Sequence, residues 1–203
     1  MKEFKARASS AGKLMTAARS KTEALSETTK TYLKEWAVSE FYGYQKEIKS
    51  KYITKGLTKE DEAIDKAIEW LDLDFVLKNE QYFEDEYFCG TPDLITDDEV
   101  LDIKNSWDCW TFPLFDNEIK NKDYFAQLQV YMHLTGKRKA RLVYVLLNTP
   151  EEMHWEQQLK YDDKPKELRI KAFEVEYDAE FIETLKSKVI ESREYINNNL
   201  KLI

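Results

Sequence analysis

Two carboxylates and a lysine, set close together in the chain, have the types and spacing for metal-dependent hydrolysis. An extended strand over 100–104 would place Asp102 and Lys104 on one face, because side chains alternate along a strand. Asp93 follows Pro92, where the chain is extended and ready to turn, so a hairpin would bring its carboxylate beside Asp102. Mg²⁺ prefers such oxygen ligands, and the lysine can orient or deprotonate a water for attack on phosphorus. The alternative is a simple ion pair between Asp102 and Lys104 on a solvated strand.

Two further polar residues are expected on apolar helix faces. At about 100° per residue, Glu60 is centred on an apolar stripe, and its carboxylate must be desolvated unless a cation meets it. A first-turn acid stabilised by the helix dipole is the alternative. Gln127 lies among apolar residues of a second helix and needs hydrogen-bond partners, which a satisfied core amide would also have. The stripe at Glu60 consists of Ala63, Ile64, Ala67, Ile68 and Leu71.

The elements that hold these residues follow from periodicity and turn signals. Gly56 is expected to break the chain, and Thr58 is a plausible N-cap of the helix that carries Glu60. No internal repeat or linker is evident, so we expect one α/β domain over residues 1–203. The other expected elements are a helix over 31–48, a hairpin over 86–106, a helix over 122–134, strands over 140–147 and 168–177, and a closing helix over 179–197.

The distribution of charge matters more than the net charge of −8, which comes from 31 Lys and Arg against 39 Asp and Glu. A net negative charge argues against a nucleic-acid partner, because binding the DNA backbone needs cationic side chains. Residues 1–21 nevertheless carry +5, and their Arg7, Lys13 and Arg19 are candidates for contacting DNA. Residues 58–102 carry −13, and a bound divalent cation would relieve part of this repulsion. A second basic cluster, over 137–141, fits either DNA contact or a solvated loop.

The cysteines, histidines and apolar segments indicate the cellular compartment and the kind of metal ligand to expect. Cys89 and Cys109 are too few for a disulfide framework, and we expect both to be buried thiols in a reducing compartment. No signal-peptide pattern and no apolar window of about 18 residues occurs, so we expect no membrane association and a cytoplasmic location. His133 and His154 are too far apart for most histidine-rich metal sites, which favours carboxylate ligands.

The order of these features resembles the PD-(D/E)XK nuclease superfamily. Within it, the chain is similar to the lambda-exonuclease-like, YqaJ-like viral recombinase exonucleases. The resemblance covers most of residues 7–147, and its most specific block is the helix that contains Gln127. The blocks that carry it are Lys55-Gly-Leu-Thr-Lys-Glu60-Asp-Glu-Ala63, Gly90-Thr-Pro-Asp93, Asp102-Ile-Lys104 and Tyr124-Phe-Ala-Gln127-Leu-Gln129-Val-Tyr131-Met-His-Leu-Thr135.

The resemblance implies a restriction-endonuclease-like core, in which helices flank a central mixed β-sheet. It implies Mg²⁺ or Mn²⁺ as cofactor, with Lys104 as the catalytic lysine and Gln127 positioning that lysine or the substrate. The early run Arg7-Ala-Ser9-Ser10 is similar to the family element that meets the DNA end and its 5′ phosphate. Asp102 stands where Glu is more usual, a departure that the superfamily pattern permits. The implied metal contacts are Asp93, Asp102, the backbone carbonyl of Ile103, and Glu60 through a second metal or its water.

The function that the resemblance implies is metal-dependent hydrolysis of linear double-stranded DNA from its ends, 5′→3′, in phage-type recombination within a bacterial host. A single-strand annealing protein as partner and a ring-shaped trimer are implied by the same analogy. One alternative is a Cas4/RecB-like nuclease without an iron–sulfur cluster, since an all-cysteine cluster would need four cysteines. A nuclease-fold DNA-binding module without catalysis and a sequence-specific restriction endonuclease are further alternatives, which Mn²⁺ titration and a circular plasmid would distinguish.

Overall fold

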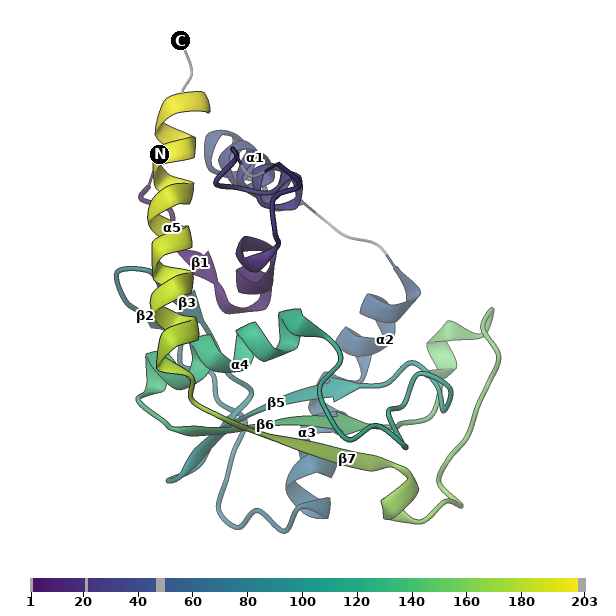
Figure 1. The fold of residues 1–203 in the computed structure, drawn as a ribbon. Coiled ribbons are helices and arrows are strands. Elements are labelled where there is room, and N and C mark those ends of the chain that lie inside the picture. The colour runs from purple at the N-terminus through teal and green to yellow at the C-terminus, as the bar shows by residue number, and fades with distance from the viewer. Residues whose placement is uncertain (1, 21, 47–49, 201–203) are drawn as a thin grey trace.

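The computed structural model describes residues 2–20, 22–46 and 50–200, which form two β-sheets and the helices around them (Figure 1). The strands are β1 (Ala6–Arg7), β2 (Phe83–Glu84), β3 (Phe88–Gly90), β4 (Leu94–Ile95), β5 (Glu99–Asn105), β6 (Lys139–Val145) and β7 (Ile170–Glu176). The α-helices are α1 (Glu27–Tyr42), α2 (Lys51–Thr58), α3 (Glu60–Trp70), α4 (Lys122–Thr135) and α5 (Ala179–Asn199). The 3₁₀ helices are η1 (Ala8–Met15), η2 (Glu151–Met153) and η3 (Lys166–Leu168).

The larger sheet is mixed, with strand order β4-β5-β6-β7. The two long central strands, β5 and β6, run parallel with Asp102 opposite Leu142, whereas β4 and β7 are antiparallel to their neighbours. Each face of this sheet has its own apolar core, because residues of β5 alternate between them: Val100 packs with α4 and α5, and Leu101 packs with α3. Helices therefore cover both faces, α4 on one side and α3 on the other (Figure 1), as the sequence predicted.

The smaller sheet joins the N-terminal segment to the middle of the chain. Its strand order is β1-β3-β2, and β1 pairs in parallel with β3, with Ala6 opposite Phe88. After β1, η1 packs tightly on the start of α4: a Cβ built on Gly12 would lie 2.7 Å from Asp123 Cα. Glycine is therefore needed at this crossing, which fixes the N-terminal segment over the helix that carries Gln127.

Local capping explains where the long helices begin and end. The Ser26 side chain accepts a hydrogen bond from Thr29 N and starts α1, and Gly43, with φ of 72°, ends it. The predicted helix over 31–48 was therefore placed too late: it begins earlier and ends at Tyr42, while residues 47 and 48 lie outside the described part of the chain. Asn121 and Gly136 bound α4 in the same way, close to the prediction.

The predicted break at Gly56 is wrong, because this glycine lies inside α2. Glycine costs about 1 kcal/mol in a helix interior, so contacts with the rest of the fold must outweigh its propensity. Those contacts include the amine of Lys55, which is 1% exposed and donates hydrogen bonds to two carbonyl groups from other segments. Thr58 ends α2 instead of capping the next helix, and α3 begins at Glu60 without a side-chain cap.

Most of the later elements match their predictions. The hairpin predicted over 86–106 is formed by β4 and β5 only, because β3 pairs with β1 and β2 in the smaller sheet. Strands β6 and β7 and helix α5 begin and end within about two residues of the predicted bounds. Cys89 is buried as expected, but the prediction for Cys109 is wrong: it is exposed in a turn where its backbone N–H donates to Tyr161 Oη. Among the described residues, no helix has the length and apolar character needed to cross a membrane.

Candidate active site

The β4–β5 hairpin brings the two predicted carboxylates together. Asp93 directly precedes β4, and the register that pairs Leu94 with Leu101 places it beside the middle of β5. Asp93 Oδ2 accepts a hydrogen bond of 2.6 Å from the backbone N–H of Ile103, the residue after Asp102. The hairpin predicted from the turn signals therefore aligns both acids at one point of the sheet.

Lys104 lies on the same face of β5 as Asp102, as the alternation of a strand predicts. Its Nζ is 2.7 Å from Asp102 Oδ2, and the Asp102 side chain is 2% exposed. The same amine lies 4.9 Å from the centre of the Tyr124 ring, which adds a cation–π contact from α4. The alternative of a simple ion pair on a solvated strand is therefore wrong about the surroundings: the two residues do form an ion pair, but it lies beneath α4.

Gln127 connects the acid and the lysine from α4. Its Nε2 donates to Asp102 Oδ1 and to Tyr131 Oη, both at 2.9 Å, and its Oε1 accepts from Lys104 Nζ at 3.4 Å. This buried amide therefore has partners on each side, as expected. Tyr131 was not among the predicted site residues, although its i, i+4 spacing from Gln127 was the available signal.

Burial raises the pKa of both carboxylates. Burial, with the charge of Asp102, raises the pKa of Asp93 to about 7. Burial also raises the pKa of Asp102, against the opposing effect of Lys104. For Lys104, burial acts to lower the pKa, but the Asp102 carboxylate outweighs it and the net shift is upward. A second positive charge at this point would stabilise both carboxylates in their ionised form.

Glu60 lines the same cavity but stands apart from the two aspartates. The cavity measures about 730 Å³ and receives Glu60 from α3, together with Asp93, Asp102, Lys104 and Gln127. The Glu60 carboxylate is not desolvated, because its side chain is 44% exposed. It does meet a cation, as the sequence allowed: Lys78 Nζ lies 2.8 Å from Glu60 Oε1. Within residues 2–20, 22–46 and 50–200, no group of three or more His, Cys, Asp or Glu is close enough to hold a metal ion.

The donor set of the hairpin nevertheless fits a magnesium ion. Mg²⁺ is usually bound through one or two carboxylates, keeps several waters and takes further ligands from substrate phosphates. Asp93 and Asp102 supply two carboxylates that line the cavity, and the Lys104 amine lies 2.7 Å from Asp102 Oδ2. A divalent cation would relieve the repulsion that raises the pKa of Asp93. Ile103 lines the same cavity.

The predicted DNA-contacting residues gather only in part. Arg7, Ser10 and Lys13 line a second cavity of about 680 Å³ between the N-terminal segment and α1, where Lys13 Nζ lies 5.0 Å from the centre of the Tyr32 ring. Ser9 and Arg19 are exposed and do not line it. Four glutamates also line this cavity, and we call it the basic cavity only for its Arg7 and Lys13. It shares no lining residue with the carboxylate cavity among those described.

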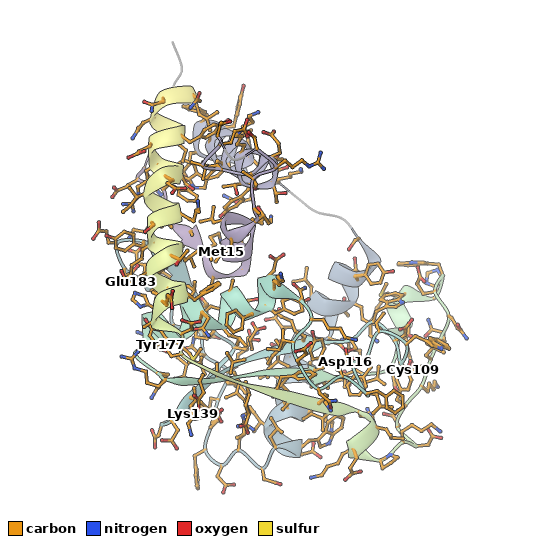
Figure 2. The ribbon with its side chains drawn as sticks, viewed as in Figure 1. Met15, Cys109, Asp116, Lys139, Tyr177 and Glu183 are labelled. Atoms are coloured by element: carbon orange, nitrogen blue, oxygen red, sulfur yellow. The ribbon has the colours of Figure 1, made fainter. Side chains whose placement is uncertain are left out.

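The basic cluster over 137–141 is engaged with the protein itself. Lys137 donates to the carbonyl of Asp97, Arg138 lies over the Tyr177 ring, and Arg141 forms an ion pair with Glu99. Figure 2 shows Lys139 at the opposite end of the sheet from Asp116, which lines the carboxylate cavity. These contacts favour a role within the fold. The solvated-loop alternative is wrong for residues 139–141, because these residues begin β6.

The fold closely resembles that of a phage-related exonuclease from Haemophilus somnus. The two structures agree with a TM-score of 0.87 and 27% sequence identity, over 98% of this chain and 96% of the other. The predicted resemblance to the lambda-exonuclease-like nucleases is thus confirmed. The restriction-endonuclease-like arrangement of helices around a mixed sheet is confirmed with it.

More distant structures share the same fold. An alkaline exonuclease, LHK-Exo from Laribacter hongkongensis, matches with a TM-score of 0.71 and 18% identity, over 97% of this chain and 93% of the other. LHK-Exo in complex with dAMP matches with a TM-score of 0.70 and 20% identity over the same shares. No family model matches the chain, and no curated protein sequence does.

Proposed function

We propose that this chain is a metal-dependent DNA exonuclease that hydrolyses phosphodiester bonds of linear duplex DNA from its ends, in the 5′→3′ direction. The observation that carries the proposal is the buried cluster of Asp93, Asp102, Lys104 and Gln127 at the floor of an open cavity. It occurs in a fold that matches a phage-related exonuclease over nearly the whole chain. The action on DNA ends and its direction come from the family resemblance.

The residues of the cluster have separate roles. Asp93, Asp102 and the carbonyl of Ile103 would hold Mg²⁺ or Mn²⁺, and Glu60 would reach a second ion or its water after leaving Lys78. When bound, the metal ion offsets the negative charge that develops on the phosphate oxygens. The raised pKa of Lys104 keeps its amine protonated at neutral pH, so it orients the attacking water and the phosphate by donating hydrogen bonds.

Gln127 holds this arrangement together in the proposed reaction. Because it binds Asp102 through its amide N–H and Lys104 through its carbonyl oxygen, it fixes the distance between the acid and the amine. The second N–H bond, to Tyr131, fixes the orientation of the amide itself. The side chain is 5% exposed, so water does not compete for these bonds.

The basic cavity is the proposed contact for the DNA end. Arg7, Ser10 and Lys13 offer cationic and hydroxyl donors that suit a terminal phosphate. Exposed Ser9 and Arg19 would contact the flanking backbone. By family analogy, the chain would act as a ring-shaped trimer, with a single-strand annealing protein as partner, in the cytoplasm of a bacterial host.

The test is time-resolved digestion of duplexes labelled at the 5′ or the 3′ end, with Mg²⁺ and with EDTA. We expect 5′-label release in Mg²⁺, none in EDTA, and no cutting of a circular plasmid. Lys104→Ala and Asp102→Ala should each lower the rate by about 10²-fold or more. Lys139→Ala, an exposed change far from the cavity, is the matched control.

Three outcomes would contradict the proposal. If folded Lys104→Ala or Asp102→Ala digested linear duplex DNA at the wild-type rate, the assignment of the active site would be wrong. Cutting of the circular plasmid would indicate an endonuclease. Binding of duplex DNA without any hydrolysis, in Mg²⁺ and in Mn²⁺, would identify a nuclease-fold binding module.

A further inference from the structure

Helix α2 and the segment that follows β5 meet at one wall of the active-site cavity. From α2, Gly56 and Leu57 line the cavity, and from the segment after β5, Ser106 and Trp107 do. The Leu57 side chain is 69% exposed, so its position depends on how the helix is attached and not on a core around it. An isolated eight-residue helix is unstable in water, and α2 also contains a glycine.

Lys55 supplies that attachment. Its side chain is 1% exposed, and Nζ donates to the carbonyl of Trp107 at 2.7 Å and to the carbonyl of Leu147 at 2.8 Å. Trp107 lies two residues beyond the end of β5, and Leu147 lies two residues beyond the end of β6. One amine therefore joins α2 to the ends of the two central strands, on the side where the cavity opens.

An aromatic contact lies beside this bond. The Tyr52 ring, one turn earlier on α2, meets the Trp107 ring edge to face at 5.2 Å between centres. Lys55 Nζ itself lies 5.9 Å from the centre of the Trp107 ring. The hydrogen bonds and the ring contact thus fix the same two segments relative to each other.

The chemistry of the buried amine suits a permanent attachment. Burial lowers the pKa of Lys55 to about 8, although the charge of Asp108 acts in the opposite direction. A neutral amine still has two N–H donors, which is the number of carbonyl groups it meets. Two N–H donors therefore suffice for both hydrogen bonds in either protonation state of Lys55.

We propose that Lys55 is a positioning residue, which holds α2 against the ends of β5 and β6 and thereby fixes the wall of the cavity that receives DNA. This inference rests on the proposed exonuclease function. The Lys104, Asp102 and Gln127 cluster is held by α4 and β5, independently of Lys55. Loss of Lys55 therefore weakens substrate binding and leaves the chemical step in place.

The test compares Lys55→Met with Lys59→Met in digestion of a linear duplex with Mg²⁺, well below the unfolding temperature of each variant. Methionine keeps an unbranched apolar stem but donates no hydrogen bond. Lys59 is four residues along the same segment and pairs with Glu62 at the surface, so it is a matched control. We expect Lys55→Met to raise KM for duplex ends by roughly tenfold with kcat within about twofold, and Lys59→Met to change neither.

Hydrogen exchange of the metal-free proteins gives a readout that does not need activity. In Lys55→Met, backbone amides of α2 and of residues 106–109 should exchange faster, while those of α4 keep their protection. Lys55→Gln, which keeps N–H donors on a shorter stem, should give a smaller change in both experiments. An inactive wild type would contradict the proposed function alone, because the exchange experiment would still report on the attachment.

The proposal is overturned by any of three results. Unchanged KM in Lys55→Met, even with a lowered unfolding temperature, would make Lys55 a residue of fold stability only. Unchanged exchange in α2 would show that other contacts hold the helix. Failure of both Lys55→Met and Lys55→Gln to fold would likewise assign Lys55 to the stability of the whole fold.

Discussion

At the scale of single residues, the site sets two requirements against each other. Burial under α4 removes Asp102 from water and leaves Lys104 as its ion-pair partner, but it also makes a second ionised carboxylate costly. Asp93 carries that cost, because its neighbour Asp102 already has the nearest cation. In the protein without a divalent cation, the cost can be lowered by keeping a proton on Asp93.

The pH dependence of stability follows from the raised pKa of Asp93. Its pKa is about 7 in the folded state against 3.8 for the ordinary group, so between these values the folded state holds a proton that the unfolded state lacks. The free energy of unfolding of the metal-free protein should therefore fall as pH rises through this window, by at most about 4 kcal/mol from this group. Asp93→Asn should remove this contribution, as measured by urea unfolding in EDTA at pH 5 and pH 8.

Asp97→Asn is the control for this experiment, because Asp97 is an exposed carboxylate in the turn of the same hairpin. The difference in unfolding free energy between wild type and Asp93→Asn should depend on pH, and the Asp97→Asn variant reports the effect of the same substitution at an exposed turn. Mg²⁺ should restore stability to the wild type at pH 8, where Asp93 is ionised. Parallel pH curves for wild type and Asp93→Asn would contradict the prediction.

At the scale of elements, the sequence predicts what depends on local pattern. The apolar run of β6, the alternation along β5 and the glycine after α4 each determine an element within a few residues, so the acids and lysine could be placed together in advance. The partners Lys78 and Lys55 could not be chosen from the sequence, whereas Tyr131 had its i, i+4 spacing from Gln127 as a signal. The roles of the two lysines depend on which distant segments meet: Lys55 contacts residues 52 and 92 positions away.

The same reasoning explains which elements were missed. Helix α2 contains Gly56, and it is held by the buried amine of Lys55 and the Tyr52 ring, which contact segments far along the chain. Helix η1 lacks a long apolar stripe and is held by its close approach to α4 at Gly12. Tertiary contacts override local propensity in both cases.

Replacing glycine by alanine should have opposite effects on stability at Gly12 and at Gly56. In Gly12→Ala the new Cβ would lie 2.7 Å from Asp123 Cα, so η1 and α4 must move apart, and we expect destabilisation by about 1–3 kcal/mol. In Gly56→Ala the new Cβ meets nothing within 4 Å, and the better helix former should stabilise the protein by up to about 1 kcal/mol. Urea unfolding of both variants measures the two effects. A Gly12→Ala variant that is not destabilised would contradict the packing described for η1, and a destabilised Gly56→Ala would contradict the helix-propensity argument.

At the scale of the whole molecule, the net charge of −8 combines acidic and basic regions that have different functions. The acids of the hairpin face a cavity that suits a cation, and other acids pair with lysines at the surface, as Glu62 does with Lys59. Cations are concentrated in the N-terminal segment, where Arg7 and Lys13 line the basic cavity. A net negative chain can therefore carry a positive N-terminal segment, with a balance of +5 over residues 1–21. We expect the cations of this segment to control the salt dependence of DNA binding.

This charge distribution predicts different effects for two cations of the chain. Binding of a 5′-phosphorylated duplex, measured with Ca²⁺ in place of Mg²⁺, should weaken as salt rises, because counterions are released from DNA. Arg7→Gln should lower the slope of log K against log salt by about 0.9, the value for one phosphate contact. Lys137→Gln should leave the slope unchanged, since Lys137 is bound to the carbonyl of Asp97 at the far end of the sheet. Equal slopes for Arg7→Gln and wild type would show that the basic cavity does not bind the DNA backbone, and a lowered slope in Lys137→Gln would transfer that role to residues 137–141.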